Sequence, residues 1–128
     1  MRSLAIATAL LLVSSGAFAV GIGNIQVTSV LNEPFVAKIP IVGASPEELV
    51  NMTVRLAEPE TYERAGIERS YLLTRLKFEV VDDGDGRAHI AVSSSDRIKE
   101  PALELIIDVN WGKGQLRRTY GILLEPPR

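Results

Sequence analysis

Apolar and polar residues alternate most regularly in two runs near the end of the chain, residues 102–111 and 115–124. In each run the apolar side chains fall on one face. Trp111 closes the first apolar face, and Arg118 is a charged exception on the second. Residues 112–114, Gly-Lys-Gly, join the runs, and glycine accepts the positive φ of a tight turn without a steric clash. A period of two over this length predicts a β-hairpin with one buried face.

The same alternation recurs in shorter segments upstream, which are residues 24–31, 35–42, 52–57, 76–80 and 88–92. With the hairpin they make about seven strands, at spacings typical of an immunoglobulin-like β-sandwich. The sequence therefore predicts an all-β fold, an immunoglobulin-like antiparallel β-sandwich. Residues 82–86 predict a tight turn and residues 93–96 a loop. Pro40 has no amide hydrogen, so we expect an edge or a bulge at that point of the second strand.

Short helical turns are predicted between the strands. Ser45 precedes a proline and stands three residues before Glu48, which predicts a capping box at the start of a short helix. Between the third and fourth strands, residues 58–66 predict a second helix that ends at Gly66, and Ser70 predicts the cap of one further turn. Because these turns are mostly polar, we expect them to cover one end of the sheets and not to form the core.

The first residues have the order of a Sec-type signal peptide. A basic start with Arg2 precedes the apolar run 4–13, and Ala17-Phe18-Ala19 forms a small-residue cleavage signal. That run is too short to cross a bilayer, and an uncleaved anchor is the alternative. We therefore expect residues 1–19 to be removed during export and residues 20–128 to form a single domain in the periplasm.

Composition narrows the possible functions. The chain has no cysteine, so an exported domain must depend on packing and not on disulfides. Removal of residues 1–19 takes away one positive charge, Arg2, and changes the formal net charge from −2 to −3. A mildly acidic balance with both signs interspersed argues against a nucleic-acid partner.

Few residues are suited to catalysis or to metal binding. His89 is the only histidine, and its place on the outward face of a predicted strand favours an exposed residue over a general base. Asp82, Asp83 and Asp85 resemble part of a calcium loop, but an EF-hand begun at Asp83 would need glutamate where Ser94 stands. We therefore expect no enzyme activity, no cofactor and no metal.

Apolar residues on the faces that the alternation points outward form another candidate feature; they are Val30, Val36, Val42, Ile106 and Leu123. Scattered residues of this kind are ordinary, whereas residues aligned on one sheet mark a partner surface, and the sequence leaves both interpretations open. The aromatic residues offer a different possibility, stacking surfaces for sugar rings, although a core position at a strand end is favoured for Trp111. The aromatic residues concerned are Trp111, Tyr120, Tyr62 and Tyr71.

The chain resembles the N-terminal periplasmic domain of the FimV/TspA family in three stretches: residues 21–49 (GIGNIQVTSVLNEPFVAKIPIVGASPEEL), 54–81 (VRLAEPETYERAGIERSYLLTRLKFEVV) and 104–127 (ELIIDVNWGKGQLRRTYGILLEPP). The most specific pieces are the initial segment 21–31, SPEEL at 45–49, AGIER at 65–69, Asn110-Trp111 and LLEPP at 123–127. Members of this family are bacterial inner-membrane proteins linked to type IV pilus assembly and to the polar organisation of motility machinery.

The resemblance implies a non-catalytic module that acts by protein–protein contact in pilus or envelope assembly. Family members continue with a LysM peptidoglycan-binding motif, a transmembrane helix and a cytoplasmic region, whereas this sequence stops at Arg128. We therefore expect a stand-alone domain with a protein partner in the periplasm or envelope, with peptidoglycan binding disfavoured. The candidate interaction or structural residues are Asn110, Trp111, Tyr120, Ile106, Leu123, Val30 and Val36. The alternative is a small cell-wall-binding or ligand-binding β-sandwich domain.

Overall fold

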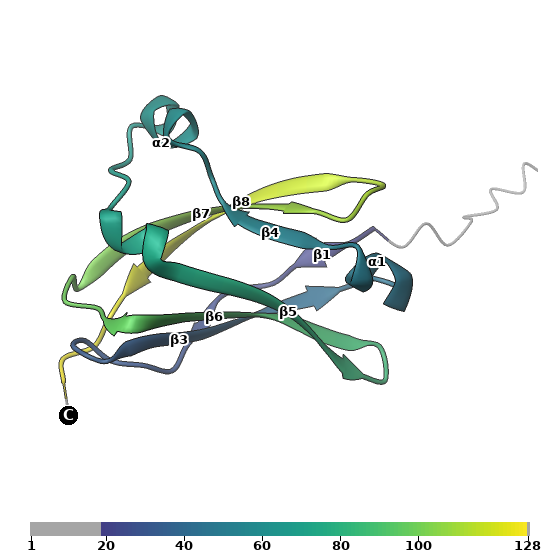
Figure 1. Cartoon of the computed structure of the whole chain (residues 1–128), viewed down its shortest axis with the longest axis horizontal. Helices are drawn as coiled ribbons and strands as arrows, with labels where there is room; N and C mark the ends of the chain where they lie inside the picture. The colour runs from purple at the N-terminus through teal and green to yellow at the C-terminus, as the bar shows by residue number, and fades with distance from the viewer. Residues whose placement is uncertain (1–18, 128) are drawn as a thin grey trace, which may run out of the picture.

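The computed structural model describes residues 19–127, which form two facing antiparallel sheets (Figure 1). The first sheet contains β1 (Gly21–Ile22), β2 (Gln26–Val27), β3 (Pro34–Val42), β6 (Arg87–Arg97) and β5 (Leu76–Gly84). The second contains β4 (Thr53–Leu56), β7 (Ala102–Asn110) and β8 (Gln115–Leu123). The predicted immunoglobulin-like antiparallel sandwich is confirmed.

The core lies between the two sheets, where the alternating apolar residues of each strand meet. In β3 the predicted inward face is buried throughout; it consists of Phe35, Ala37, Ile39 and Ile41. The β7–β8 hairpin supplies the opposing layer, with Leu103, Leu105, Ile107 and Val109 from β7. The period of two in the sequence therefore corresponds to the inside and the outside of the sandwich.

Of the predicted first strand, residues 24–31, only Gln26–Val27 form a strand, β2; a second short strand, β1, precedes the predicted range, and the two pair with β3 on either side of Pro40. β1 pairs with Ile41 and Val42, and β2 pairs with Ala37 and Lys38. Between them, the Gly23 amide donates to the Pro40 carbonyl at 2.8 Å. Proline has no amide hydrogen to return, so the ladder breaks there and the expected irregularity at Pro40 is confirmed.

The predicted helical turns are present as α1 (Pro46–Val50), α2 (Pro59–Ala65) and the 3₁₀ helix η1 (Tyr71–Arg75). Ser45 and Glu48 form the capping box, Gly66 ends α2 at a φ of 69°, and the Ser70 side chain caps η1. None of the helices in the described part is long and apolar enough to cross a membrane.

The expectation that these turns only cover one end of the sheets is wrong. Tyr62 of α2 is 1% exposed, and Leu73 of η1 is equally buried. Where β4 ends, the Tyr62 hydroxyl donates to the Glu104 carbonyl at 3.0 Å and accepts from the Ile106 amide at 2.7 Å. Tyr62, the buried residue of a mostly polar helix, therefore packs α2 against the core.

The predicted loop at residues 93–96 is also wrong, because β6 continues to Arg97. Ser94 is buried there; its hydroxyl accepts from the Phe35 amide at 2.8 Å and donates to the Asp96 carbonyl at 2.6 Å. A run of serines suggested a loop, but this serine binds backbone groups where the register of β3 and β6 shifts.

Candidate functional site

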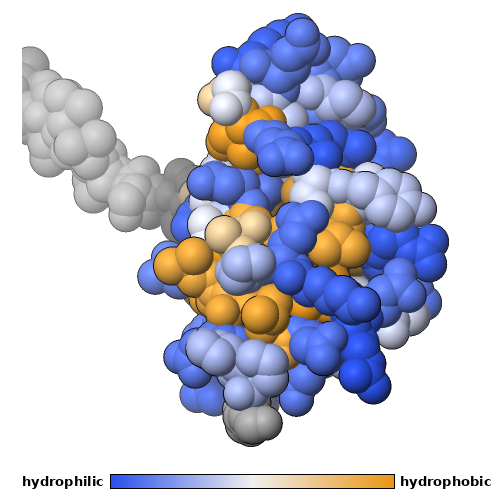
Figure 2. All heavy atoms as spheres, turned by 90° about the vertical axis from the view of Figure 1, so that its left-hand side faces the viewer, coloured by the Kyte–Doolittle hydropathy of each residue, from blue (hydrophilic) through white to orange (hydrophobic). Residues whose placement is uncertain are grey.

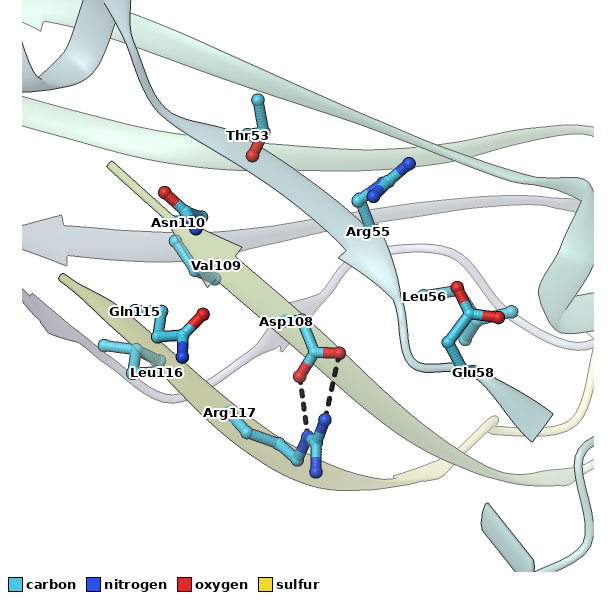
Figure 3. Close-up of a pocket in the computed structure, with 10 residues that line it drawn as sticks. All are labelled: Thr53, Arg55, Leu56, Glu58, Asp108, Val109, Asn110, Gln115, Leu116 and Arg117. Atoms are coloured by element: carbon cyan, nitrogen blue, oxygen red, sulfur yellow. Dashed lines mark hydrogen bonds and ion pairs between the residues drawn. The ribbon is translucent and has the colours of Figure 1, made fainter. Parts of the chain in front are cut away.

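A polar hollow of about 560 Å³ lies on the outer face of the β4-β7-β8 sheet (Figure 3). Its lining residues are Thr53, Arg55, Leu56, Glu58, Asp108, Val109, Asn110, Gln115, Leu116 and Arg117. Polar side chains reach it from all three strands because alternate residues of each strand point outward. The solvent-facing side of this sheet therefore presents amide, hydroxyl, carboxylate and guanidinium groups.

An ion pair in this hollow joins Arg117 and Asp108, which stand opposite each other in the hairpin. Arg117 Nε donates to Asp108 Oδ1 at 2.6 Å and the guanidinium also donates to Oδ2 at 3.2 Å (Figure 3). The hydrogen bond to Asp108, followed by its charge, raises the pKa of Arg117 above its ordinary value. Both side chains are substantially exposed, so the pair contributes little to stability and mainly fixes the direction of the guanidinium.

The predicted candidate Asn110 lies on the rim of the polar hollow and shapes the adjoining turn. Its side-chain oxygen accepts from the Gly112 amide at 2.9 Å, where Gly112 takes a φ of 92°. This is the local hydrogen bond by which asparagine favours turns. The hollow as a whole can bind polar groups through hydrogen bonds, but its lining contains neither a histidine nor a cysteine for acid–base or nucleophilic chemistry.

A second hollow, of about 510 Å³, lies on the outer face of the other sheet and contains His89. His89 Nδ1 is 2.6 Å from Asp83 Oδ2, and the histidine side chain is only 14% exposed. The expected outward direction of His89 is thus correct, but the residue is more buried than we expected. No serine, threonine or cysteine lines this hollow, so the pair has no adjacent nucleophile to activate among the residues described.

The acidic turn next to His89 is held by its own hydrogen bonds. The Asp82 carboxylate accepts from the Gly84 amide at 2.9 Å, and Asp83 binds His89. Asp85 and Gly86 both take positive φ, as a tight two-residue hairpin turn requires. Within residues 19–127 no group of three or more histidine, cysteine, aspartate or glutamate side chains is placed to hold a metal ion.

The outward apolar residues do not form a single surface. Val36 and Val42 are exposed on β3, in the five-stranded sheet, whereas Leu123 is exposed on β8, in the three-stranded sheet. The expectation that Val30 and Ile106 are exposed is wrong, because they are 5% and 2% exposed. Val30 follows the end of β2 in a turn, where strand alternation no longer applies.

Ile106 points outward as its position in β7 requires, but α2 covers it. Thr61 and Ala65 of α2 line a small hollow together with Ile106, and the Tyr62 hydroxyl accepts a hydrogen bond from the Ile106 amide. The sequence shows a polar helix and an apolar residue on the outer face of a strand. Only the path of the chain brings the two together.

Exposed apolar residues gather at one end of the sandwich. Leu123 is 81% exposed and pairs with the exposed Ala102, while the half-buried Leu31 donates its amide hydrogen to the Glu125 carbonyl at 2.8 Å. Figure 2 views the left-hand end of Figure 1 and shows apolar side chains in the middle of this face, interrupted by polar ones. We call Leu31, Ala102 and Leu123 the apolar end patch.

The aromatic candidates are mostly committed to the core. Trp111 is half-buried, packs on the core and lies so close to Gly114 that a Cβ there would meet its ring at 2.6 Å. Tyr120 is buried, and its hydroxyl donates to the Gly23 carbonyl at 2.7 Å. Burial raises the pKa of Tyr120, an effect that the Arg118 charge partly opposes. Stacking on a sugar would therefore be limited to Trp111 and the exposed Tyr71.

Arg118, the exception on the apolar face of the hairpin, connects the two sheets. Its guanidinium lies 5.1 Å from the centre of the Tyr120 ring and donates to the Ile22 carbonyl at 2.5 Å. The stem of arginine can pack on apolar neighbours while its head binds a carbonyl, which explains a charged residue at this position.

Comparison with known proteins identifies the fold family. Residues 20–127 match the family model described as the FimV N-terminal domain, an Ig-like domain. The chain belongs to this family. It is 39% identical over 123 residues to the motility hub protein FimV from two strains of Pseudomonas aeruginosa, PAO1 and UCBPP-PA14. The match covers 96% of this chain and 13% of those relatives, so the chain spans a small part of their length.

The comparison with solved structures finds a likeness to the BIgI domain of beta protein from S. agalactiae, bound to CEACAM1. The match covers 82% of this chain and 100% of that chain at 10% identity, with a TM-score of 0.42. That likeness is too low to support any argument about binding.

Proposed function

We propose that this FimV N-terminal domain is a non-catalytic protein-interaction module of the periplasm, which takes part in type IV pilus assembly or in organisation of the cell envelope. The observation that carries the proposal is its 39% identity, over 96% of the chain, to a motility hub protein. The name of that relative denotes a protein that brings other components together. A domain that matches this relative over 96% of its own chain is suited to one such contact.

The surface supports a binding role. Both large hollows lie on sheet faces, and among the described residues no hydroxyl or lysine in either lining is hydrogen-bonded to a histidine or a carboxylate that could activate it. The apolar end patch exposes Leu123 almost fully, and the rim of the sandwich presents strand edges. These are features of interaction surfaces.

Export to the periplasm rests on the start of the sequence. The family match begins at residue 20, directly after the expected cleavage signal that ends in Ala19. Val20 is already part of the core, so the folded domain starts where the signal peptide is expected to end. N-terminal sequencing of the protein from the periplasmic fraction should give Val20 as the first residue; a full-length chain in the cytoplasm would contradict export.

Affinity purification after cross-linking tests the interaction role. The full chain, with a C-terminal tag, is expressed in a bacterium that carries type IV pili, and the recovered proteins are identified by mass spectrometry. We expect envelope or pilus assembly components to be enriched over a strain that exports an unrelated tagged immunoglobulin-like domain. Recovery of no such component would count against the proposal.

A second candidate function, binding of a cell-wall glycan, is favoured by one observation, the polar hollow of about 560 Å³. Amide, carboxylate and guanidinium side chains of that kind form hydrogen bonds with sugar hydroxyl groups. The burial of Tyr120 and Tyr62 weakens this candidate, because it removes two aromatic rings from the surface. Co-sedimentation with purified peptidoglycan separates the two: the interaction module stays in the supernatant, and a glycan-binding domain appears in the pellet.

A further inference from the structure

The outer edge of β8 is a row of backbone groups without a strand partner. The Trp111 amide donates to the Gly114 carbonyl at 3.1 Å, and the Leu124 amide donates to the Pro101 carbonyl at 2.8 Å. These bonds fix which β8 residues bind β7, because hydrogen-bonded pairs alternate along an antiparallel ladder. The even-numbered residues bind β7. The amide and carbonyl groups that face away belong to Gln115, Arg117, Thr119, Gly121 and Leu123.

This edge differs from the other edges of the sandwich. One edge of the five-stranded sheet is formed by β1 and β2, which both pair with β3, and this edge is interrupted at Gly23. The other edge of the three-stranded sheet is β4, which is only four residues long. β5 is nine residues long, but its pairing is irregular between Asp82 and Gly84. β8 is also nine residues long, with continuous register and no proline. Proteins commonly protect an exposed edge with proline, a bulge or a short strand, and β8 has none of these.

The segment that passes nearest to β8 leaves this edge free. Arg118 and Tyr120 reach the carbonyl groups of Ile22 and Gly23 through their side chains, from the inner face of the sheet. Within residues 19–127, β8 pairs with β7 alone. On the outer face, a Cβ at Gly121 would have no atom within 4 Å, so there is room for a neighbouring side chain near the C-terminal end of the strand.

The charge of β8 selects the kind of strand that can bind. Residues 111–124 contain Lys113, Arg117 and Arg118 and no acidic residue, in a chain whose net charge is negative. The carboxylates of Glu104 and Asp108 lie on β7, about 5 Å further from the edge. Asp108 and Arg117 form an ion pair and compensate each other. The remaining positive charges of this segment are therefore Lys113, in the turn, and Arg118, whose guanidinium binds the neutral Ile22 carbonyl. Pairing two copies of β8 would place like charges together, whereas an acidic strand would place opposite charges together.

We propose that β8 binds an extended acidic segment of a partner protein, which adds to the three-stranded sheet as a fourth strand. The inference rests on the proposed function, since it names the surface and the partner chemistry of the interaction module. Backbone hydrogen bonds at the five outward positions supply the attachment, and the charges of Lys113 and Arg118 favour an acidic sequence.

Amide hydrogen exchange measured by NMR, with a synthetic probe peptide, tests this inference. The probe is a nine-residue peptide of alternating glutamate and valine, and its counterpart has lysine in place of glutamate. In the free protein, the outward amides should exchange faster than those that bind β7. The acidic peptide should slow exchange at Arg117, Thr119 and Gly121 by at least about tenfold at saturation. The lysine peptide should leave these rates unchanged.

Two controls separate strand addition from a general attraction between charges. An acidic peptide that is N-methylated at alternate residues keeps its charge but cannot complete the ladder, so its binding should be lost. In the protein, Thr119→Pro removes one outward amide without touching the bonds to β7, and it should weaken binding about tenfold or more. Thr119→Val keeps that amide and a β-branched side chain, and it should bind like the natural sequence.

Equal protection by the lysine peptide, or full binding of the N-methylated peptide, would overturn the inference. Unchanged exchange at the three amides in the presence of the acidic peptide would overturn it as well. The proposed function is tested separately by cross-linking and purification. Recovery of envelope partners that Thr119→Pro does not reduce would retain the interaction module and place its contact on another surface.

Discussion

The hydroxyl group of Tyr62 occupies the place along β7 where a further residue of β4 would otherwise bind. Ala57 makes the last backbone bond to β7, through the Ile106 carbonyl, and the chain then turns away into α2. The Glu104 carbonyl and the Ile106 amide would be left without partners in a buried position, and the tyrosine satisfies both. A single side chain thus completes the sheet where the strand ends.

Tyr62→Phe keeps the ring but removes both hydrogen bonds. The two backbone groups would then be buried and unsatisfied, so the free energy of unfolding should fall by about 1–3 kcal/mol. Urea unfolding followed by tryptophan fluorescence measures the change. Tyr71→Phe, at an exposed position, is the matched control and should leave the midpoint unchanged. An equal midpoint for both variants would show that water replaces the hydroxyl.

Gly66 ends α2 in the left-handed conformation, at a φ of 69°. Gly66→Val should lower the free energy of unfolding by about 1–2 kcal/mol, because a β-branched residue is strained at positive φ. No heavy atom lies within 4 Å of a Cβ at this position, so the cost is purely conformational. Gly66→Asn should cost much less, since asparagine tolerates this conformation. Similar losses for both variants in a thermal melt would point to a different cause.

At the scale of elements, the alternation of apolar and polar residues in the final hairpin gives its two strands one inner and one outer face with different roles. Its inner face fills the core, and its outer face carries the pair of Asp108 and Arg117 into the polar hollow. Trp111 closes the inner face at the turn, where its ring lies against Gly114 and remains half-exposed. The ring contributes to the hairpin more than to the centre of the core.

Trp111→Ala should therefore destabilise the domain without unfolding it. A fully buried tryptophan would cost about 3–5 kcal/mol, and we expect roughly half of that for a half-buried ring. The loss of near-UV circular dichroism with temperature measures the effect, because fluorescence is lost with the residue. A variant that is unfolded at room temperature would show that the hairpin depends on this ring as a core residue.

The strands of the sandwich were predictable because each has one buried face, and a period of two in apolar residues records that face directly. The same reasoning failed where tertiary neighbours decide burial. Ile106 is outward in β7 and yet buried, because α2 lies over it. Ser94 is polar and yet part of a strand, because its hydroxyl satisfies backbone groups. No local pattern reports such contacts.

The candidate site was less predictable than the fold. The opposition of Asp108 and Arg117 follows from the hairpin register and was recoverable once the turn at Gly112 was placed. The polar hollow also needs Thr53 and Arg55, whose strand joins β7 on its other side. Strand order between distant segments is set by the packing of the two sheets, and the order β4-β7-β8 cannot be deduced from spacing alone.

At the scale of the whole molecule, two buried tyrosines link stability to alkaline pH. Burial raises the pKa of Tyr62 and of Tyr120 above the ordinary value of 10.0. A tyrosine with a higher pKa in the folded state contributes its full stability below the unfolded pKa. It loses that contribution as pH rises from there toward the folded pKa. The domain should therefore be insensitive to tyrosine ionisation up to about pH 10 and become less stable above it.

Unfolding midpoints in urea at pH 8 to 11 test this dependence. The decline above about pH 10 should be smaller in Tyr120→Phe, which lacks one of the two buried phenols. Tyr71→Phe again serves as the control and should follow the natural protein. An equal decline in Tyr120→Phe would assign the alkaline loss to other groups.

The link from Arg118 and Tyr120 to the first strand also has a mechanical consequence. The described chain enters on the right of Figure 1 through β1, which two residue pairs hold to β3, and leaves at the lower left after β8, which nine pairs hold to β7. The side chains of Arg118 and Tyr120 bind the carbonyl groups of Ile22 and Gly23, just where the chain enters. A pulling force between the two ends therefore passes directly from the entering strand to the leaving strand. Such a force loads the two β1–β3 pairs, this side-chain tie and the end of the β7–β8 ladder, whereas β4 and β5 lie outside its path.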